Sequence, residues 1–147
     1  FGLSETLTNK FLDYLNEENI MKVTSTFEKA DNKLDIKIIN ILDEPDVISV
    51  TDAGYEYIKQ WKLVIQTEII WYDLIKQKEI LNNTVNEFVL YNYNQDIGVD
   101  DIDNDQDGLV DSQDPDESTG GSPRNALLKI GIDLTSKRII EELTSIW

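Results

Sequence analysis

The sequence predicts an α+β fold in which two helices pack on one face of a roughly four-stranded, mostly antiparallel sheet. Three observations predict it. Apolar residues recur at helical spacing near both ends of the chain, and two long central segments alternate apolar with other residues. Between them and the last helical segment, residues 92–121 follow neither period. With 147 residues, the chain is long enough for one domain, which we assign to residues 1–147.

The first helix is expected from Ser4 to Asn19. Ser4 is a residue type that caps helices, and Glu5 suits the positive end of the helix dipole. One apolar stripe then runs along the helix; it includes Leu7, Phe11, Tyr14 and Leu15.

Four strands are expected to follow. Met21–Phe27 alternates apolar and polar residues, and Leu34–Leu42 forms a second strand that the Asp43–Asp46 segment ends, because Pro45 cannot donate to a ladder. No period is clear in Val47–Tyr57, although Asp52–Gly54 looks like a turn. The strongest strand is Lys59–Asp73, and a turn at Leu74–Gln77 joins it to a strand at Glu79–Tyr91, so these two should form a hairpin.

The last helix is expected to begin at Ser122–Pro123, with a serine cap and a first-turn proline, and to end at Trp147. Its apolar side carries Leu127, Ile130, Leu134, Ile140 and Leu143. Gly131 counts as a weakness of about 1 kcal/mol relative to alanine.

If both helices cover one face of the sheet, the opposite face remains open and only partly apolar. Four side chains of the strongest strand fall on it: Lys62, Gln66, Glu68 and Tyr72. Such a surface suits contact with a partner, and a solvated face is an equally open interpretation.

The composition excludes several classes of function. The net charge is −16, no basic patch is visible, and nucleic-acid binding is therefore not expected. The chain contains neither cysteine nor histidine, which excludes thiol chemistry, histidine-dependent triads and zinc sites built on those residues. Because the sequence starts at Phe1 without a signal peptide, we expect a processed or trimmed chain.

The segment from Asp96 to Glu117 holds ten acidic residues and no basic one, which leaves a net charge of −6 for the rest of the chain. Residues 103–114 follow the spacing of a calcium-binding loop, with Gly108 at the sharp turn of position 6. The expected Ca²⁺ ligands are Asp103, Asp105, Asp107, the Leu109 carbonyl, Asp111 and Asp114. A merely solvated acidic linker is the alternative.

This loop resembles the Asp-rich calcium repeats of the thrombospondin type 3 kind, although the pattern occurs once. Position 12 is aspartate rather than the longer glutamate, which makes bidentate closure doubtful. A structural Ca²⁺ in residues 92–121 would gather an insertion that its own charge would otherwise expand.

Other segments resemble the lipopolysaccharide-assembly lipoprotein family, LptE. Gly2-Leu3-Ser4-Glu5-Thr6-Leu7-Thr8-Asn9 is similar to its first-helix signature, and Met21-Lys22-Val23 with Ala30–Ile36 is similar to strands that follow. Trp61–Ile65 resembles its long third strand, and Leu74–Ile80 the turn after that strand. Ala126–Trp147 resembles the final helix, which ends in tryptophan.

The resemblance implies a non-enzymatic lipoprotein of the outer membrane, facing the periplasm, with a lipid anchor upstream of this chain. Its expected partners are an LptD-like outer-membrane β-barrel, inside which it would dock, and lipopolysaccharide. Two other interpretations stay open. One is a calcium-stabilised extracellular or periplasmic binding or adhesion module, and the other is a periplasmic lipoprotein that regulates or exports different cargo.

Overall fold

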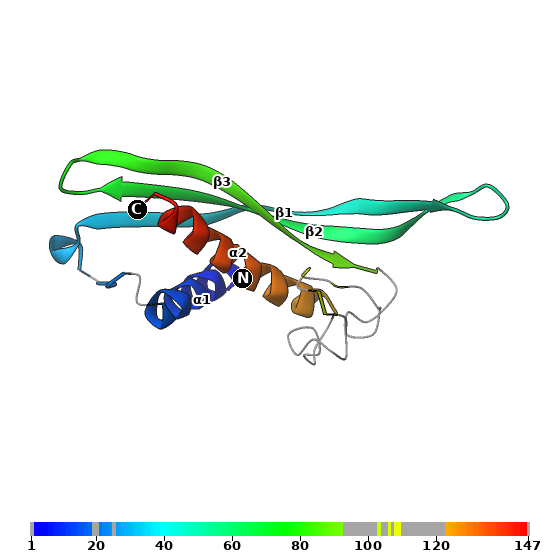
Figure 1. Cartoon of the computed structure of the whole chain (residues 1–147), viewed down its shortest axis with the longest axis horizontal. Helices are drawn as coiled ribbons and strands as arrows, with labels where there is room; N and C mark the ends of the chain where they lie inside the picture. Colours follow the sequence, from blue (N-terminus) through cyan, green and yellow to red (C-terminus); the bar gives the residue numbers. More distant parts are fainter. Residues whose placement is uncertain are drawn as a thin grey trace.

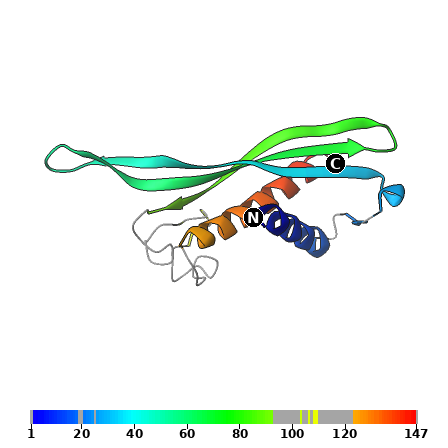
Figure 2. The same cartoon turned by 180° about the vertical axis from the view of Figure 1, so that it is seen from behind.

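The structure is a computed structural model that describes residues 2–18, 21–24, 26–92, 103, 106, 108–109 and 123–146. Within them, strands β1 (Asn32–Val50), β2 (Glu56–Asp73) and β3 (Lys78–Tyr91) form an antiparallel sheet in the order β1-β2-β3. Helices α1 (Leu3–Glu17) and α2 (Pro123–Thr144) lie on the same side of this sheet (Figure 1; Figure 2 shows the same layers from behind). The predicted α+β class is therefore confirmed.

The central strand β2 and its hairpin with β3 agree closely with the sequence prediction. Odd-numbered residues of β2 from Leu63 to Asp73 are buried, and the even-numbered ones between them are half-buried. Asp73 closes the turn, because its Oδ1 accepts hydrogen bonds from the amides of Lys76 (2.9 Å) and Ile75 (3.0 Å). These amides, the Lys76 N–H first, hold the pKa of Asp73 below its usual value.

The prediction that Pro45 ends the second strand is wrong. β1 continues to Val50, and Pro45 pairs with Trp61 directly before a shift of register between Pro45 and Val47. The physical reason is that β1 is an edge strand, where a missing N–H removes no bond to a neighbour on its free side. The turn expected at Asp52–Gly54 does join β1 to β2, and Gly54 has a φ of +88°.

The strand expected at Met21–Phe27 is also wrong. Met21–Thr24 form no strand, and Phe27 begins a short 3₁₀ helix, Phe27–Lys29. Alternation indicates a strand only when one set of side chains is buried against a sheet. Val23 and Phe27 are instead 51 % and 66 % exposed. The described residues therefore contain three strands, not four.

Both helices form close to where they were expected. Leu7, Phe11 and Leu15 of α1 are buried, as the apolar stripe predicts. Ser4 is not the cap: it lies inside the helix, where its carbonyl accepts the Thr8 hydroxyl (2.8 Å), and Gly2 is the residue before the first turn. α2 begins at Pro123, whereas Asn19, Ser122 and Trp147 lie outside the described residues.

The core lies between the helices and the sheet in two clusters. The first joins α1, α2 and one end of the sheet: Leu7, Phe11, Leu15, Ile69, Trp71, Val85, Ile132, Ile139 and Leu143. The second joins the start of α2 to the other end: Leu63, Val89, Tyr91, Ala126, Leu127 and Ile130. Most hydrophobic stabilisation of the described fold comes from these clusters.

A polar contact ties α1 to α2. The Tyr14 hydroxyl donates to Asp133 Oδ1, and Lys137 Nζ lies 3.0 Å from Asp133 Oδ2. Burial, reinforced by the Asp133 carboxylate, raises the pKa of Tyr14 to about 12. Burial alone would raise the pKa of Asp133, but the hydrogen bonds from Tyr14 and Lys137 outweigh it and the pKa is lowered.

A second polar contact fixes the start of α2 to the sheet. Arg124 Nη1 lies 2.6 Å from Asp43 Oδ1, and the Tyr91 hydroxyl donates to the same oxygen at 2.8 Å. Partial burial would raise the pKa of Asp43, but these two donors outweigh it and the pKa is lowered. Asp43, expected to help end a strand, therefore joins β1, β3 and α2.

Candidate binding surfaces

The face of the sheet opposite the helices carries all four predicted partner-contact residues. Lys62, Gln66, Glu68 and Tyr72 are half-buried and lie on one side of β2, as the alternation predicts. The strand register extends each of them into a row of three residues across the sheet. We call this surface the open face; its rows are Lys33–Tyr72–Glu79, Asp35–Ile70–Asn82, Lys37–Glu68–Thr84, Asn40–Gln66–Asn86, Leu42–Val64–Phe88 and Glu44–Lys62–Leu90.

One row of the open face is entirely apolar. Leu42, Val64 and Phe88 are half-buried and lie side by side across the three strands. Lys62 borders this row: its Nζ lies 5.7 Å from the centre of the Phe88 ring and 3.6 Å from Glu44 Oε2. This row cannot be read from the sequence, because Leu42, Val64 and Phe88 become neighbours only through the registers of β1 with β2 and of β2 with β3.

The remaining rows of the open face are mostly polar. Gln66 has an amide neighbour on each side, Asn40 on β1 and Asn86 on β3. Glu68 lies directly opposite Lys37 of β1 in the strand register. The open face is thus one apolar row framed by uncharged amides and scattered ions, and its contact with a partner stays a prediction.

The β1–β2 hairpin extends beyond the rest of the described fold. The pairing of β2 with β3 ends at Trp61–Tyr91, so the segment beyond it is a two-stranded ribbon. Figure 1 shows this arm projecting well past both helices. Several apolar side chains on it are exposed: Val47, Ile48, Val50, Tyr55 and Tyr57. Two-stranded ribbons gain little stability alone, so these exposed side chains are available for contact with a partner.

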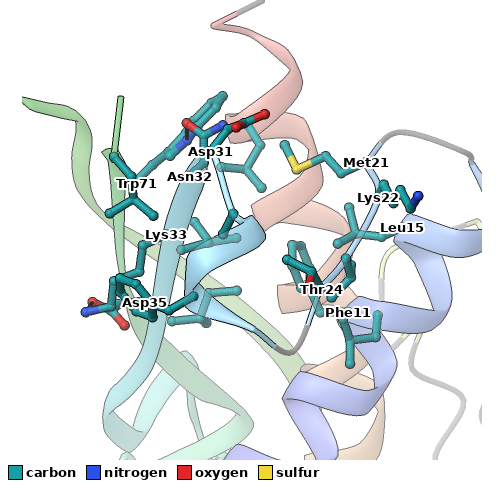
Figure 3. Close-up of a pocket in the computed structure, with 18 of the residues that line it drawn as sticks. Phe11, Leu15, Met21, Lys22, Thr24, Asp31, Asn32, Lys33, Asp35 and Trp71 are labelled. Atoms are coloured by element: carbon teal, nitrogen blue, oxygen red, sulfur yellow. Dashed lines mark hydrogen bonds and ion pairs between the residues drawn. The ribbon is translucent and has the colours of Figure 1, made fainter. Parts of the chain in front are cut away.

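A hollow of about 860 Å³ lies between α1, the segment that follows it and the start of β1 (Figure 3). Its apolar wall combines side chains from α1 and the connection with others from the sheet and α2: Phe11, Leu12, Leu15, Met21, Leu34, Ile36, Trp71 and Leu143. On the sheet side, Trp71 is held by a hydrogen bond from its indole N–H to Asn32 Oδ1 (3.0 Å).

Three lysines line the same hollow: Lys22, Lys29 and Lys33. Lys33 Nζ lies 2.8 Å from Asp35 Oδ2, whereas Lys22 and Lys29 are exposed and take part in none of the ion pairs formed by described residues. Asp31 is a further carboxylate at the lining. An apolar wall beside free ammonium groups suits an amphiphile with an anionic head. The sequence alone does not show that these three lysines line the same hollow.

The predicted calcium loop falls mainly outside the described residues, which exclude Asp105, Asp107, Asp111 and Asp114. Asp103, Gln106, Gly108 and Leu109 are described. The Gly108 N–H donates to Asp103 Oδ2 at 2.8 Å, and the φ of Gly108 is +92°. No group of three metal-binding side chains occurs among the described positions. The calcium assignment therefore stays a prediction.

The chain matches no protein-family model, no curated protein and no solved structure. None of the helices within the described ranges is long and apolar enough to cross a bilayer.

Proposed function

We propose that this chain is a non-enzymatic docking subunit of the outer-membrane lipopolysaccharide translocon. It sits on the periplasmic side of the outer membrane and docks inside a β-barrel of the LptD-like kind. The observation that carries the docking is the open face, where the apolar row Leu42–Val64–Phe88 crosses three strands opposite both helices. The sequence resemblance supplies the identity of the host.

The arm supports the same proposal. The tyrosines and branched aliphatic residues of the arm are exposed, because no other described part of the fold covers them. They therefore offer apolar area for contact with a partner. Tyr55 is 73 % exposed at the tip and Tyr57 is 48 % exposed nearby. A ribbon of this shape enters a confined space, such as the interior of a barrel, more readily than a broad domain does.

The lysine-lined hollow supports contact with lipopolysaccharide. Its apolar wall suits acyl chains, and Lys22 and Lys29 suit the phosphate groups of the headgroup. Asp31 and Asp35 line the hollow as well, but Asp35 pairs with Lys33, which leaves Lys22 and Lys29 outside the ion pairs of the described residues. The hollow is therefore the proposed glycolipid contact.

An enzymatic role has less support from the described residues. Burial raises the pKa of Glu87, while Arg138 opposes that effect and Glu141 adds to it. A carboxyl group with a raised pKa is useful as a general acid only beside a substrate site. Glu87 lies on β3 and does not line the hollow.

We further propose that residues 103–114 bind a structural Ca²⁺. The hydrogen bond from the Gly108 amide to Asp103 Oδ2 brings loop positions 6 and 1 together, as a loop wrapped around one cation requires. The positive φ of Gly108 provides the sharp turn. The metal would reduce the mutual repulsion of the acidic segment.

Co-purification tests the docking proposal. The full-length protein, tagged and extracted from outer membranes in detergent, should bring down a β-barrel protein that mass spectrometry identifies. Val64→Glu should abolish capture because it places a charge in the apolar row, while Asn9→Glu on the exposed side of α1 should not. A soluble, monodisperse protein that captures no barrel would favour the calcium-stabilised binding or adhesion module instead.

A further inference from the structure

The two outer strands of the sheet differ in how their free edges are protected. The edge of β1 carries Pro45, three shifts of register and the acidic residues Asp43, Glu44 and Asp46. Proline, bulges and charges are the devices that prevent an edge from pairing with another strand. β3 has no proline, and its single irregularity lies at its start, opposite Trp71–Tyr72. Within the described residues, its outer edge is therefore more regular than that of β1.

One hydrogen bond identifies which residues of β3 point outward. The Thr84 N–H donates to the side-chain Oδ1 of Asn83 at 2.9 Å, so it is directed away from β2. In an antiparallel strand, N–H and C=O of one residue point to the same side and alternate along the chain. Asn82, Asn86 and Phe88 therefore share the orientation of Thr84. Within the described ranges, no strand or loop pairs with this edge.

The charge beside this edge restricts what can pair there. Glu87, Glu141 and Glu142 lie along it, and Arg138 is their basic neighbour, 3.2 Å from Glu142 and 3.7 Å from Glu141. The Asn83 side-chain amide also donates to Glu142 (3.2 Å), which places these acids next to the centre of β3. The three glutamates outnumber their one basic neighbour, Arg138, so the described charges beside this edge are net negative. A second copy would bring the same acids together.

We propose that the outer edge of β3 binds an extended, basic segment of another protein, which adds to the sheet as a fourth strand. Its backbone pairs with Asn82, Asn86 and Phe88, and with Thr84 after the incoming strand displaces the Asn83 side chain from the Thr84 N–H. Its basic side chains lie beside Glu87 and the acids of α2. Recognition by strand addition combines main-chain hydrogen bonds with alternate side-chain contacts. These four residues also belong to the open face, but strand addition uses their backbone groups, which lie in the plane of the sheet, rather than their side chains.

The test uses a capped eight-residue peptide of alternating lysine and valine, with hydrogen exchange of the protein's amides read by NMR. We expect the peptide to slow exchange at Asn82, Thr84, Asn86 and Phe88, and to leave Val85, already in the ladder with β2, unchanged. Asn86→Pro removes an outward N–H and should weaken the peptide about ten-fold, the effect of one lost hydrogen bond. Asn86→Ala is the matched control and should bind normally.

Two further peptides separate strand pairing from simple charge attraction. A peptide of alternating glutamate and valine should fail to slow exchange, because its charge repels the acids beside the edge. A peptide of alternating lysine and glycine should also fail, because glycine has a poor strand propensity. The proposal is overturned if the lysine and valine peptide slows none of the four amides, or if the lysine and glycine peptide slows them equally. Protection that rises with protein concentration alone would assign the edge to a second copy instead. The wild-type exchange data decide the question even if Asn86→Pro does not fold.

Discussion

Gly131 of α2 faces Ile65 of β2 so closely that a Cβ atom at position 131 would lie 2.5 Å from Ile65 Cδ1. Ile65 is fully buried, and Val89 Cγ2 would lie 3.4 Å from the same Cβ. Gly131 is therefore the point at which the last helix approaches the sheet. The sequence alone treats this glycine as a weakness, whereas the packing requires it.

We expect Gly131→Ala to lower the free energy of unfolding by about 1 kcal/mol, because overpacking costs about 1–3 kcal/mol and alanine regains only about 1 kcal/mol of helix propensity. Urea unfolding followed by tryptophan fluorescence measures it. In an Ile65→Val background, which removes the Cδ1 atom, the same substitution should cost less. A stabilising Gly131→Ala in the wild-type chain would contradict the close contact.

Thr67 offers a test of the core. It is fully buried on the helix side of β2, and its hydroxyl has no hydrogen-bond partner within the described residues. Thr67→Val should therefore raise the free energy of unfolding by about 1 kcal/mol, since an unpaired buried hydroxyl is removed at constant shape. Thr135→Val is the control: the Thr135 hydroxyl donates to the Gly131 carbonyl at 2.7 Å, so its removal should not stabilise. Equal effects would count against this assignment.

The contact between Tyr14 and Asp133 predicts a loss of stability in alkali. Folding raises the pKa of Tyr14 from its ordinary value of 10.0 to about 12, so the phenol favours folding below pH 10. As the pH rises from about 10 to about 12, the unfolded chain releases this proton first, and the contribution is lost. An ultraviolet difference titration of wild type against Tyr14→Phe should show a transition near 12. Asp133→Asn should move it to lower pH, and an unchanged transition would contradict the contact.

The calcium assignment predicts a ranking of variants. Asp107→Ala should weaken Ca²⁺ binding more than Asp116→Ala, because Asp116 lies outside residues 103–114. Titration calorimetry measures the difference, and equal effects would contradict the proposed register. Chelation should increase protease cutting near Gly108 while the circular dichroism of the sheet and helices stays constant.

The sequence predicts best the parts of the fold that one amphipathic period describes. β2 alternates over its whole buried length, and the stripe of α1 is read directly from Leu7, Phe11 and Leu15. The sequence-based prediction fails where the position of a segment in the tertiary structure determines its conformation. Pro45 is tolerated because β1 is an edge, and Met21–Phe27 alternates without a neighbouring strand.

The binding surfaces follow the same rule. Lys62, Gln66, Glu68 and Tyr72 could be placed on one face from β2 alone. Their neighbours Leu42 and Phe88 could not, because register is a long-range property. Lys22, Lys29 and Lys33 likewise come to line one hollow only through the path of the chain after α1, which carries no periodic signal.

Site-specific photo-crosslinking in living cells tests the docking proposal most directly. A benzoylphenylalanine in place of Tyr72 lies on the open face, and one in place of Lys129 lies on the exposed side of α2. We predict that the full-length protein with the probe at Tyr72 forms a covalent adduct with an outer-membrane β-barrel, whereas the probe at Lys129 does not. Adducts from Lys129 alone, or no adduct with a barrel from either position, would contradict docking through the open face.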